Sequence, residues 1–331
     1  MLRLLAAYCY RAVYKLHHAL CLRPGAPLQH SKLIVVGSFR TGGAGKTPFC
    51  IWLCNHLAAQ GKAVALLAHE YAFDEINLLR QKFSDNESVQ VFATRNRYRL
   101  AHELDKSRKF DFIVCDDGFE DSRLTGAVTL LLQWEAPPTK ISELWPYGKM
   151  RSLAKDHDLD SPMVRILRCD DGNPAVQFVI DKVLHFASGD KFIHQKASVV
   201  CGLGNPERFC KDLENFGIGI AHKFFFKDHS KTFAAQFEQI LQTHPQDAFV
   251  ISEKDAARLP AEFIQKNVNS LIFVASQTTE ISPEATQILL KARLPLSNFF
   301  PSFYISEKEG RNHDAHKPYP ELDASSLSGI P

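Results

Sequence analysis

Runs of mainly apolar residues alternate with longer mixed stretches along the first half of the chain. Short apolar runs bounded by turn residues are typical of buried strands, and the mixed stretches have the length and spacing of helices. Strands that alternate with helices predict an α/β fold with a parallel, doubly wound sheet and a site at the carboxyl ends of its strands. The five runs lie at residues 33–36, 62–67, 89–92, 110–115 and 130–132.

The second half of the chain shows the same alternation on a smaller scale. Apolar residues at 176–180 and 183–186 predict a β-rich connection, and strands are expected again at 198–201 and 248–251. We therefore expect a second, smaller α/β domain. The predicted parts are an amphipathic helix (1–25), a core domain (26–170), the connection (171–197), a smaller domain that closes over the site (198–305) and a polar, Pro-rich, disordered tail (306–331).

The N-terminal segment has the spacing of an amphipathic helix that ends at Pro24 and Gly25. Its apolar face contains Leu2, Leu5, Cys9, Val13, Leu16 and Leu20. The basic residues Arg3, Arg11 and Lys15 lie away from that face. Such a helix either lies in a membrane interface or packs its apolar face on the protein core. The absence of acidic residues favours the membrane.

Charge is unevenly distributed along the chain. The 331 residues carry a formal net charge of +2. Residues 1–69 contain eight Lys and Arg and no Asp or Glu, so this segment carries +8 and the remainder −6. A basic N-terminal segment indicates an anionic partner, either membrane phosphate or nucleic acid.

The eight cysteines are scattered and form no C-x-x-C pair, so the sequence predicts neither a disulfide framework nor a zinc cluster. The N-terminal segment lacks the clean apolar run and the small-residue cleavage site of a secretory signal. No apolar stretch approaches the length of a membrane span. We therefore expect a cytoplasmic protein.

A glycine-rich segment follows the first predicted strand. Residues 37–48 read Gly-Ser-Phe-Arg-Thr-Gly-Gly-Ala-Gly-Lys-Thr-Pro. A buried strand, a glycine-rich turn and Lys-Thr at a helix start are typical of P-loop proteins that bind nucleoside triphosphates. Arg40 stands where the usual pattern has its first glycine, and an ordinary glycine-rich turn is the alternative.

Each part of this loop has an expected role. Lys46, as a catalytic residue, would neutralise the β- and γ-phosphates, and the Thr47 hydroxyl would hold Mg²⁺. The backbone amides of the loop would surround the phosphates. The expected phosphate-binding residues are Thr41, Gly42, Gly43, Ala44, Gly45, Lys46 and Thr47.

The fourth predicted strand ends in Asp116 and Asp117, followed by Gly118. In a chain with a phosphate loop, a carboxylate pair at a strand end indicates a Walker B element that binds Mg²⁺ directly or through water. Asp-Asp-Gly is also a common turn, which is the alternative. Further along, Arg151 lies in a Pro-rich loop, where it either clamps a phosphate or is a solvated charge.

Two features of the second domain have simple alternatives. Gly202-Leu203-Gly204 is better explained as a tight turn than as a dinucleotide site. His229 beside Asp228 forms either an acid/base dyad or a capped loop, and the periodicity favours the loop.

Taken together, these blocks resemble one family, the tetraacyldisaccharide 4′-kinases of lipid A biosynthesis. The resemblance spans roughly residues 30 to 260, and the order and spacing of the blocks make it specific. The family's phosphate loop also lacks the leading glycine. The matching blocks are 42–48, 116–119, 146–151, 202–209, 227–229 and 252–256.

The resemblance implies an ATP- and Mg²⁺-dependent kinase acting on the 4′-hydroxyl of a tetraacyldisaccharide 1-phosphate. It would be a peripheral, monomeric enzyme at the cytoplasmic face of the bacterial inner membrane, held there by its N-terminal helix, without a nucleic acid partner. The family's catalytic Asp and His match Asp74 and His229, which together would accept the proton of the sugar hydroxyl. Substrate contacts are implied for Tyr71, Asp121 and Arg151.

The chain departs from the family pattern where the acceptor would bind. The family's Ser-Arg-Gly-Tyr-Gly reads Ala-His-Glu-Tyr-Ala at 68–72, and the stretch that normally precedes Asp74 is almost absent. The family's His after the Asp-Asp-Gly block is Asp121, and its Glu after the loop arginine is Ser152. These changes leave open an altered acceptor or weakened catalysis.

Two other functions stay open at this point. One is a catalytically silent, membrane-associated relative that retains the fold. The other is a P-loop GTPase of the metallochaperone or targeting type. No N-K-x-D guanine signature is evident, and Lys254-Asp255 lacks the preceding asparagine, which counts against the GTPase.

Overall fold

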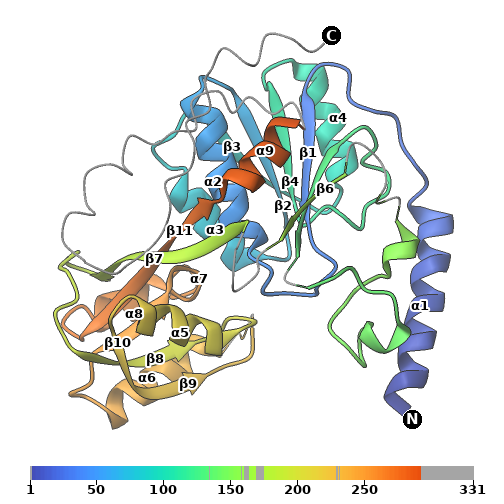
Figure 1. Ribbon diagram of the computed structural model, residues 1–331. Helices are drawn as coiled ribbons and strands as arrows, with labels where there is room; N and C mark the ends of the chain where they lie inside the picture. The colour runs from blue at the N-terminus through green and yellow to red at the C-terminus, as the bar shows by residue number, and fades with distance from the viewer. Residues whose placement is uncertain are drawn as a thin grey trace, which may run out of the picture. The chain divides into compact units, whose positions relative to one another are not determined.

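Figure 1 shows the computed structural model of the protein. The described residues belong to one compact unit. The predicted tail (306–331) and His229 lie outside them. The structure describes residues 2–133, 135–157, 159, 164–168, 175–228, 230 and 232–291.

Within the described residues, the first sheet has six strands in the order β3-β2-β4-β1-β5-β6, all parallel. This confirms the predicted doubly wound sheet. From β1 the chain continues to β2, towards one edge of the sheet, and from β4 it continues to β5, towards the opposite edge. A crevice therefore forms at the carboxyl ends of β1 and β4. The strands are β1 (Lys32–Gly37), β2 (Val64–His69), β3 (Val89–Thr94), β4 (Phe112–Asp116), β5 (Val128–Gln133) and β6 (Val164–Arg168).

Helices cover both faces of this sheet (Figure 1). Ile34 and Val36 of β1 point to the face that α2 and α3 cover, whereas Leu33 and Val35 point to the face that α4 covers. This alternation follows from the two-residue period of a strand. The helices are α2 (Lys46–Ala59), α3 (Phe73–Lys82) and α4 (Arg97–Ser107), with two short 3₁₀ helices, η1 (Ile141–Glu143) and η2 (Ala154–Asp156), after β5.

The second sheet has five strands within the described residues, in the order β7-β11-β10-β8-β9. All its pairs are parallel except β7 with β11, which is antiparallel. The strands are β7 (Val176–His185), β8 (Lys196–Cys201), β9 (Gly219–Phe225), β10 (Phe249–Ser252) and β11 (Ile272–Ile281). Its helices are α5 (Pro206–Asn215), α6 (Phe233–Thr243), α7 (Glu253–Ala256) and α8 (Ala261–Lys266).

The two sheets share part of one core. Val176 and Phe178 of β7 are buried among side chains of the first sheet and α2. Helix α9 (Pro283–Lys291) joins the same cluster through Ala285 and Leu289. Segments of the second half of the chain therefore pack on the first sheet, and the predicted domain boundaries stay predictions.

The N-terminal helix α1 (Leu2–Cys21) packs through its less apolar face. Ala7 is buried against Phe39 and Leu153, and Arg11 forms a 2.8 Å ion pair with Asp156. The predicted apolar face is exposed instead, at 60–66% for Leu5, Val13, Leu16 and Leu20. The alternative that this face packs on the core is therefore wrong. Among the described helices, none combines the length and apolar character needed to span a bilayer.

Candidate active site

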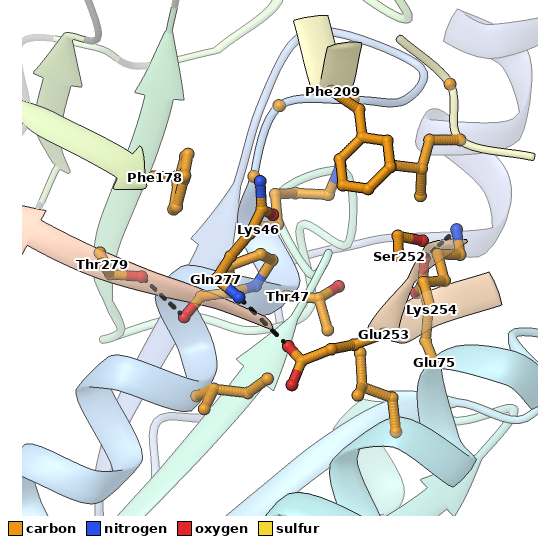
Figure 2. A pocket seen from close by; sticks show the side chains of 18 of the residues that line it. Lys46, Thr47, Glu75, Phe178, Phe209, Ser252, Glu253, Lys254, Gln277 and Thr279 are labelled. Carbon is orange, nitrogen blue, oxygen red and sulfur yellow. Dashed lines mark hydrogen bonds and ion pairs between the residues drawn. The ribbon is translucent and has the colours of Figure 1, made fainter. Parts of the chain in front are cut away.

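A cavity of about 770 Å³ lies at the carboxyl ends of the first sheet. Its walls come from both sheets, with the glycine-rich loop and α2 facing β11, α5 and α7. Figure 2 looks into it, with Lys46 and Thr47 near the middle of the view. A cavity of this size has room for a nucleotide and part of a second substrate.

The glycine-rich loop has the backbone that anion binding requires. Gly43 and Gly45 have φ angles of 69° and 81°, in the left-handed region that favours glycine. A Cβ added to Gly45 would lie 2.1 Å from the ring of Phe178, so close packing also demands glycine there. Helix α2 begins directly after Gly45. The loop amides and the positive end of α2 together suit phosphate.

The predicted lysine and arginine meet at one carboxylate. Lys46 Nζ lies 3.5 Å from Asp117 Oδ1, and Arg151 donates two hydrogen bonds to Asp117 at 2.7 and 2.8 Å. Arg151 also donates to the Thr41 carbonyl at 3.2 Å. Burial opposes ionisation of Asp117, but Lys46 and Arg151 outweigh it and hold its pKa below the ordinary value. Two cations therefore lie beside the phosphate loop.

Asp116 has the surroundings of a metal ligand. Thr47 Oγ1 donates to Asp116 Oδ2 at 3.0 Å. Burial and the neighbouring carboxylates of Glu75 and Asp117 raise the pKa of Asp116 to about 6. Its Oδ1 is buried and has no hydrogen-bond partner within the described residues. An unpaired carboxylate oxygen beside a hydroxyl suits a hard cation, so these residues fit Mg²⁺.

The rest of a Mg²⁺ coordination sphere would have to come from elsewhere. In the part of the chain that the structure describes, no three His, Cys, Asp or Glu side chains cluster as a metal site. Mg²⁺ is commonly held by one or two carboxylates together with substrate phosphates and water. The pair Thr47 and Asp116, next to the phosphate loop, corresponds to that arrangement.

A second charged cluster links α3 to the segment around α7. Arg258 donates to the buried Asp74 at 3.0 Å, and Lys254 Nζ lies 3.8 Å from the same carboxylate. Lys254 also contacts Glu75 at 3.0 Å and Asp228 at 3.2 Å. Burial disfavours the charge of Lys254, but the three carboxylates outweigh it and raise its pKa. This cluster places Lys254, Glu75 and Asp228 on the cavity wall.

The segment that carries Lys254 is anchored by buried hydrogen bonds. Ser252 caps α7 by accepting from the Asp255 amide at 3.1 Å, and its hydroxyl donates to the Asp255 carboxylate at 2.7 Å. Asp255 in turn accepts from the Gly202 amide at 3.1 Å. These bonds join the ends of β10 and β8 and hold Lys254 at the cavity.

The chain has clear relatives. Residues 1–294 match the family model described as "Tetraacyldisaccharide-1-P 4'-kinase". The chain belongs to this family. A tetraacyldisaccharide 4′-kinase of Halothermothrix orenii is 25% identical over 333 aligned residues, covering 83% of this chain and 85% of the relative. One of Chlamydia abortus is 26% identical over 271 residues, covering 69% and 72%.

A solved structure supports the fold. It is LpxK from Aquifex aeolicus in complex with ATP, with a TM-score of 0.59 and 18% identity, covering 88% of this chain and 99% of that one. At this identity the likeness shows a shared fold. Family membership also confirms the predicted activity class, because members of the tetraacyldisaccharide 4′-kinase family are kinases of lipid A biosynthesis.

The structure brings most of the predicted phosphate-side residues together. Residues 41–47, Asp117 and Arg151 all line the cavity. Asp116 is joined to it through Thr47. Asp74 is buried and is not among the lining residues, although its neighbour in sequence, Glu75, is one of them. The roles assigned to these residues stay predictions.

The predicted substrate contacts Tyr71 and Asp121 do not line the cavity. Tyr71 is exposed, with the Arg95 guanidinium 5.2 Å above its ring. The Asp121 carboxylate accepts two hydrogen bonds from the Arg123 guanidinium, each 2.8 Å long, and one from the Arg123 amide at 3.2 Å. His229 cannot be placed, because it lies outside the described residues. The roles of all three stay predictions.

Sequence reasoning missed the two cations that hold Asp74. Lys254 lies in the block 252–256, which matches the family pattern, so a signal for it was present. Arg258 has no such signal, because its contact with Asp74 spans 184 residues of sequence and arises only in the fold.

Proposed function

We propose that this kinase transfers the γ-phosphate of ATP to the 4′-hydroxyl of a tetraacyldisaccharide 1-phosphate at a membrane surface. The observation that carries the proposal is the phosphate loop with Lys46, Asp117 and Arg151 gathered beside it in one cavity. Enzymes of this type work mostly by positioning and by neutralising charge on the transferred group. Family membership supports the acceptor.

The glycine-rich loop would bind the phosphates of ATP. The amides of residues 42–47 and the start of α2 would hold the triphosphate. Lys46 and Arg151 now share Asp117, so an arriving phosphate would offer both cations a second anion. Their charge would then lie where negative charge develops as the bond to the γ-phosphate breaks.

Thr47 and Asp116 would hold Mg²⁺. The buried, unpaired Oδ1 of Asp116 and the hydroxyl beside it supply the oxygens. Mg²⁺ held by these two residues would supply positive charge that neutralises the phosphates. Because the pKa of Asp116 is raised to about 6, metal binding would displace a proton from this carboxyl in the acid range.

Asp74 and His229 are the proposed base for the acceptor hydroxyl. Lys254 and Arg258 each contact both Asp74 and Asp228, and Asp228 directly precedes His229. Asp74 and Asp228 therefore share two cations. Asp74 and His229 would take the proton of the 4′-hydroxyl as its oxygen bonds to phosphorus.

The exposed apolar face of α1 is the proposed membrane contact. Leucines and a valine on this face would enter the interface, while the buried contacts of Arg11 and Ala7 keep the helix on the protein. The excess of basic residues in 1–69 would favour anionic lipid at the cytoplasmic surface. The acyl chains of the acceptor could then stay in the bilayer while its sugar reaches the cavity.

The proposal is tested by phosphate transfer in vesicles that contain anionic lipid and a tetraacyldisaccharide 1-phosphate. We expect a product with one added phosphate, placed at the 4′ position by fragmentation mass spectrometry, and faster transfer from ATP than from GTP. Absence of any phosphorylated lipid would favour the catalytically silent relative. Equal use of GTP would contradict the nucleotide assignment.

A further inference from the structure

The partly buried carboxylate of Glu120 joins α1 to the loop that carries Arg151. Tyr14 Oη donates to Glu120 Oε2 at 2.5 Å, and Ser152 Oγ donates to Glu120 Oε1 at 2.8 Å. Glu120 itself lies in the turn after β4. Each oxygen of this carboxylate therefore binds a different segment of the chain.

His157 completes the network around Ser152. Its Nε2 lies 2.8 Å from Ser152 Oγ and 3.4 Å from Tyr14 Oη. Its ring stacks on Phe119 with centroids 4.1 Å apart. Burial lowers the pKa of His157 to about 4, so the ring is neutral near pH 7.

The same loop is also bonded to the phosphate loop. The Arg151 amide donates to the Phe39 carbonyl at 2.7 Å, and the Thr41 amide donates to the Lys149 carbonyl at 3.0 Å. The Arg151 side chain reaches Asp117, three residues before Glu120 in the same turn. Adjacent residues of one loop, Arg151 and Ser152, are thus held by two carboxylates of one turn.

We propose that Glu120 is a positioning residue that sets Arg151 against the phosphate site, a role that rests on the proposed function. It supplies, from the turn after β4, the carboxylate that the family pattern has at position 152. Here that position is a serine, and its hydroxyl lies 2.8 Å from the Glu120 carboxylate. A carboxylate from a different segment of the chain is therefore hydrogen-bonded to this serine.

Glu120 acts on Arg151 in two ways. Its charge adds to that of Asp117 in stabilising the guanidinium, which keeps Arg151 in its present orientation. Its hydrogen bond to Ser152 holds the backbone on which Arg151 sits. Through Tyr14, the same carboxylate fixes α1, so one residue connects the proposed membrane helix to the phosphate site.

The test measures Mg-ATP affinity by titration calorimetry, which needs no turnover. Glu120→Gln should weaken binding about tenfold, the effect of one charged interaction. Because the effect acts through Arg151, Glu120→Gln should change affinity less than about twofold in an Arg151→Met background. The exchange pair Glu120→Gln with Ser152→Glu should recover most of the lost affinity.

Milder variants guard against loss of the fold. Tyr14→Phe and Ser152→Ala each remove one donor to the carboxylate, and each should weaken binding by about threefold. Tyr8→Phe is the matched control, since Tyr8 lies exposed on the same helix and should bind as wild type does. Thermal unfolding of every variant shows whether the protein is folded.

Three results would overturn the role of Glu120. They are unchanged affinity in Glu120→Gln, an equal loss in the Arg151→Met background, and an exchange pair no better than Glu120→Gln. A wild type that binds Mg-ATP with the expected variant pattern but transfers no phosphate would refute the proposed function alone. A wild type that binds no Mg-ATP would refute both.

Discussion

The proposed phosphate end of the cavity and its proposed acceptor end are built in different ways. The phosphate end is one continuous segment between β1 and α2, whose shape depends on backbone conformation at Gly43 and Gly45. The proposed acceptor end depends on side chains from distant segments, such as Lys254 on Glu75 at the cavity wall and Arg258 on Asp74 outside the cavity lining. A site formed by the backbone of one continuous segment leaves a recognisable motif in the sequence, whereas a set of long-range ion pairs does not.

The departures from the family pattern follow this division. They fall at 68–72, at Asp121 and at Ser152, all outside the glycine-rich loop, whose residues 42–47 match the family. Around Ser152 the structure offers a replacement carboxylate from Glu120. Side-chain sites can exchange residues between neighbouring segments, because only the final position of the charge matters. Backbone sites lack that freedom.

The largest expected effect is at the phosphate end. Lys46→Ala should lower kcat roughly 10³-fold or more, because the positive charge that would stabilise the transferred phosphoryl group is lost. Lys106→Ala, an exposed lysine of α4, is the control and should transfer phosphate as wild type does. Steady-state transfer to the lipid acceptor is the measurement. Near-normal transfer by Lys46→Ala would show that the loop does not hold the nucleotide.

Asp74→Asn should affect the acceptor end alone. We expect kcat to fall about 10²- to 10³-fold, as for a lost general base, with Mg-ATP affinity unchanged. Asp85→Asn, in the exposed turn after α3, is the control. Because Arg258 loses a buried partner, a lower unfolding temperature should accompany the change. Parallel loss of nucleotide binding would mean that the two ends are not separable.

The pH dependence of stability should report the side-chain network behind α1. The pKa of His157 is about 4 in the folded protein, below the ordinary value of about 6.5, so the unfolded chain takes up this proton first as pH falls. The contribution of neutral His157 to the free energy of unfolding is therefore full above about pH 6.5 and is lost towards pH 4. The loss is about 2 kcal/mol between pH 7 and about pH 4.5.

Urea unfolding of wild type and His157→Gln at both pH values isolates this contribution. Between pH 7 and about pH 4.5, the free energy of unfolding should fall by about 2 kcal/mol more in wild type than in the variant. Other titrating groups, including Glu120, whose pKa burial raises, cancel to first order in the comparison. Identical pH dependence in the two proteins would show that His157 is not held neutral.

The last expected effect concerns membrane binding. Leu16→Ser with Leu20→Ser should weaken binding to anionic vesicles roughly 10- to 100-fold, because two apolar side chains no longer enter the interface. Stability should be unchanged, since both are exposed. Ile193→Ser with Val268→Ser, also exposed but in the second half of the chain, is the control. Equal loss in both pairs would argue against a specific role of α1.

Some elements of the fold could be predicted from the sequence and others could not. Strand β1 and the glycine-rich loop were predictable because a fully buried strand is a continuous apolar run and the loop needs its glycines. Strand β11 was not predicted, since its second half, Gln-Thr-Thr-Glu, is polar where it pairs with β7. Short β6 left no distinct signal either.

For α1, periodicity identified the apolar face but not which face packs on the protein. The packed face depends on Tyr14 with Glu120 and Arg11 with Asp156, whose partners are more than 100 residues away. The same holds for Arg258 and Asp74. Such pairs depend on tertiary structure, and neither propensity nor spacing along the chain can indicate them.

A crystal structure with Mg²⁺ and a non-hydrolysable ATP analogue tests the central claim most directly. The account predicts that the triphosphate lies on the amides of residues 42–47 and that Lys46 Nζ, now 3.5 Å from Asp117, contacts its β- and γ-phosphate oxygens. Phosphates bound elsewhere, with Lys46 still paired to Asp117, would contradict it.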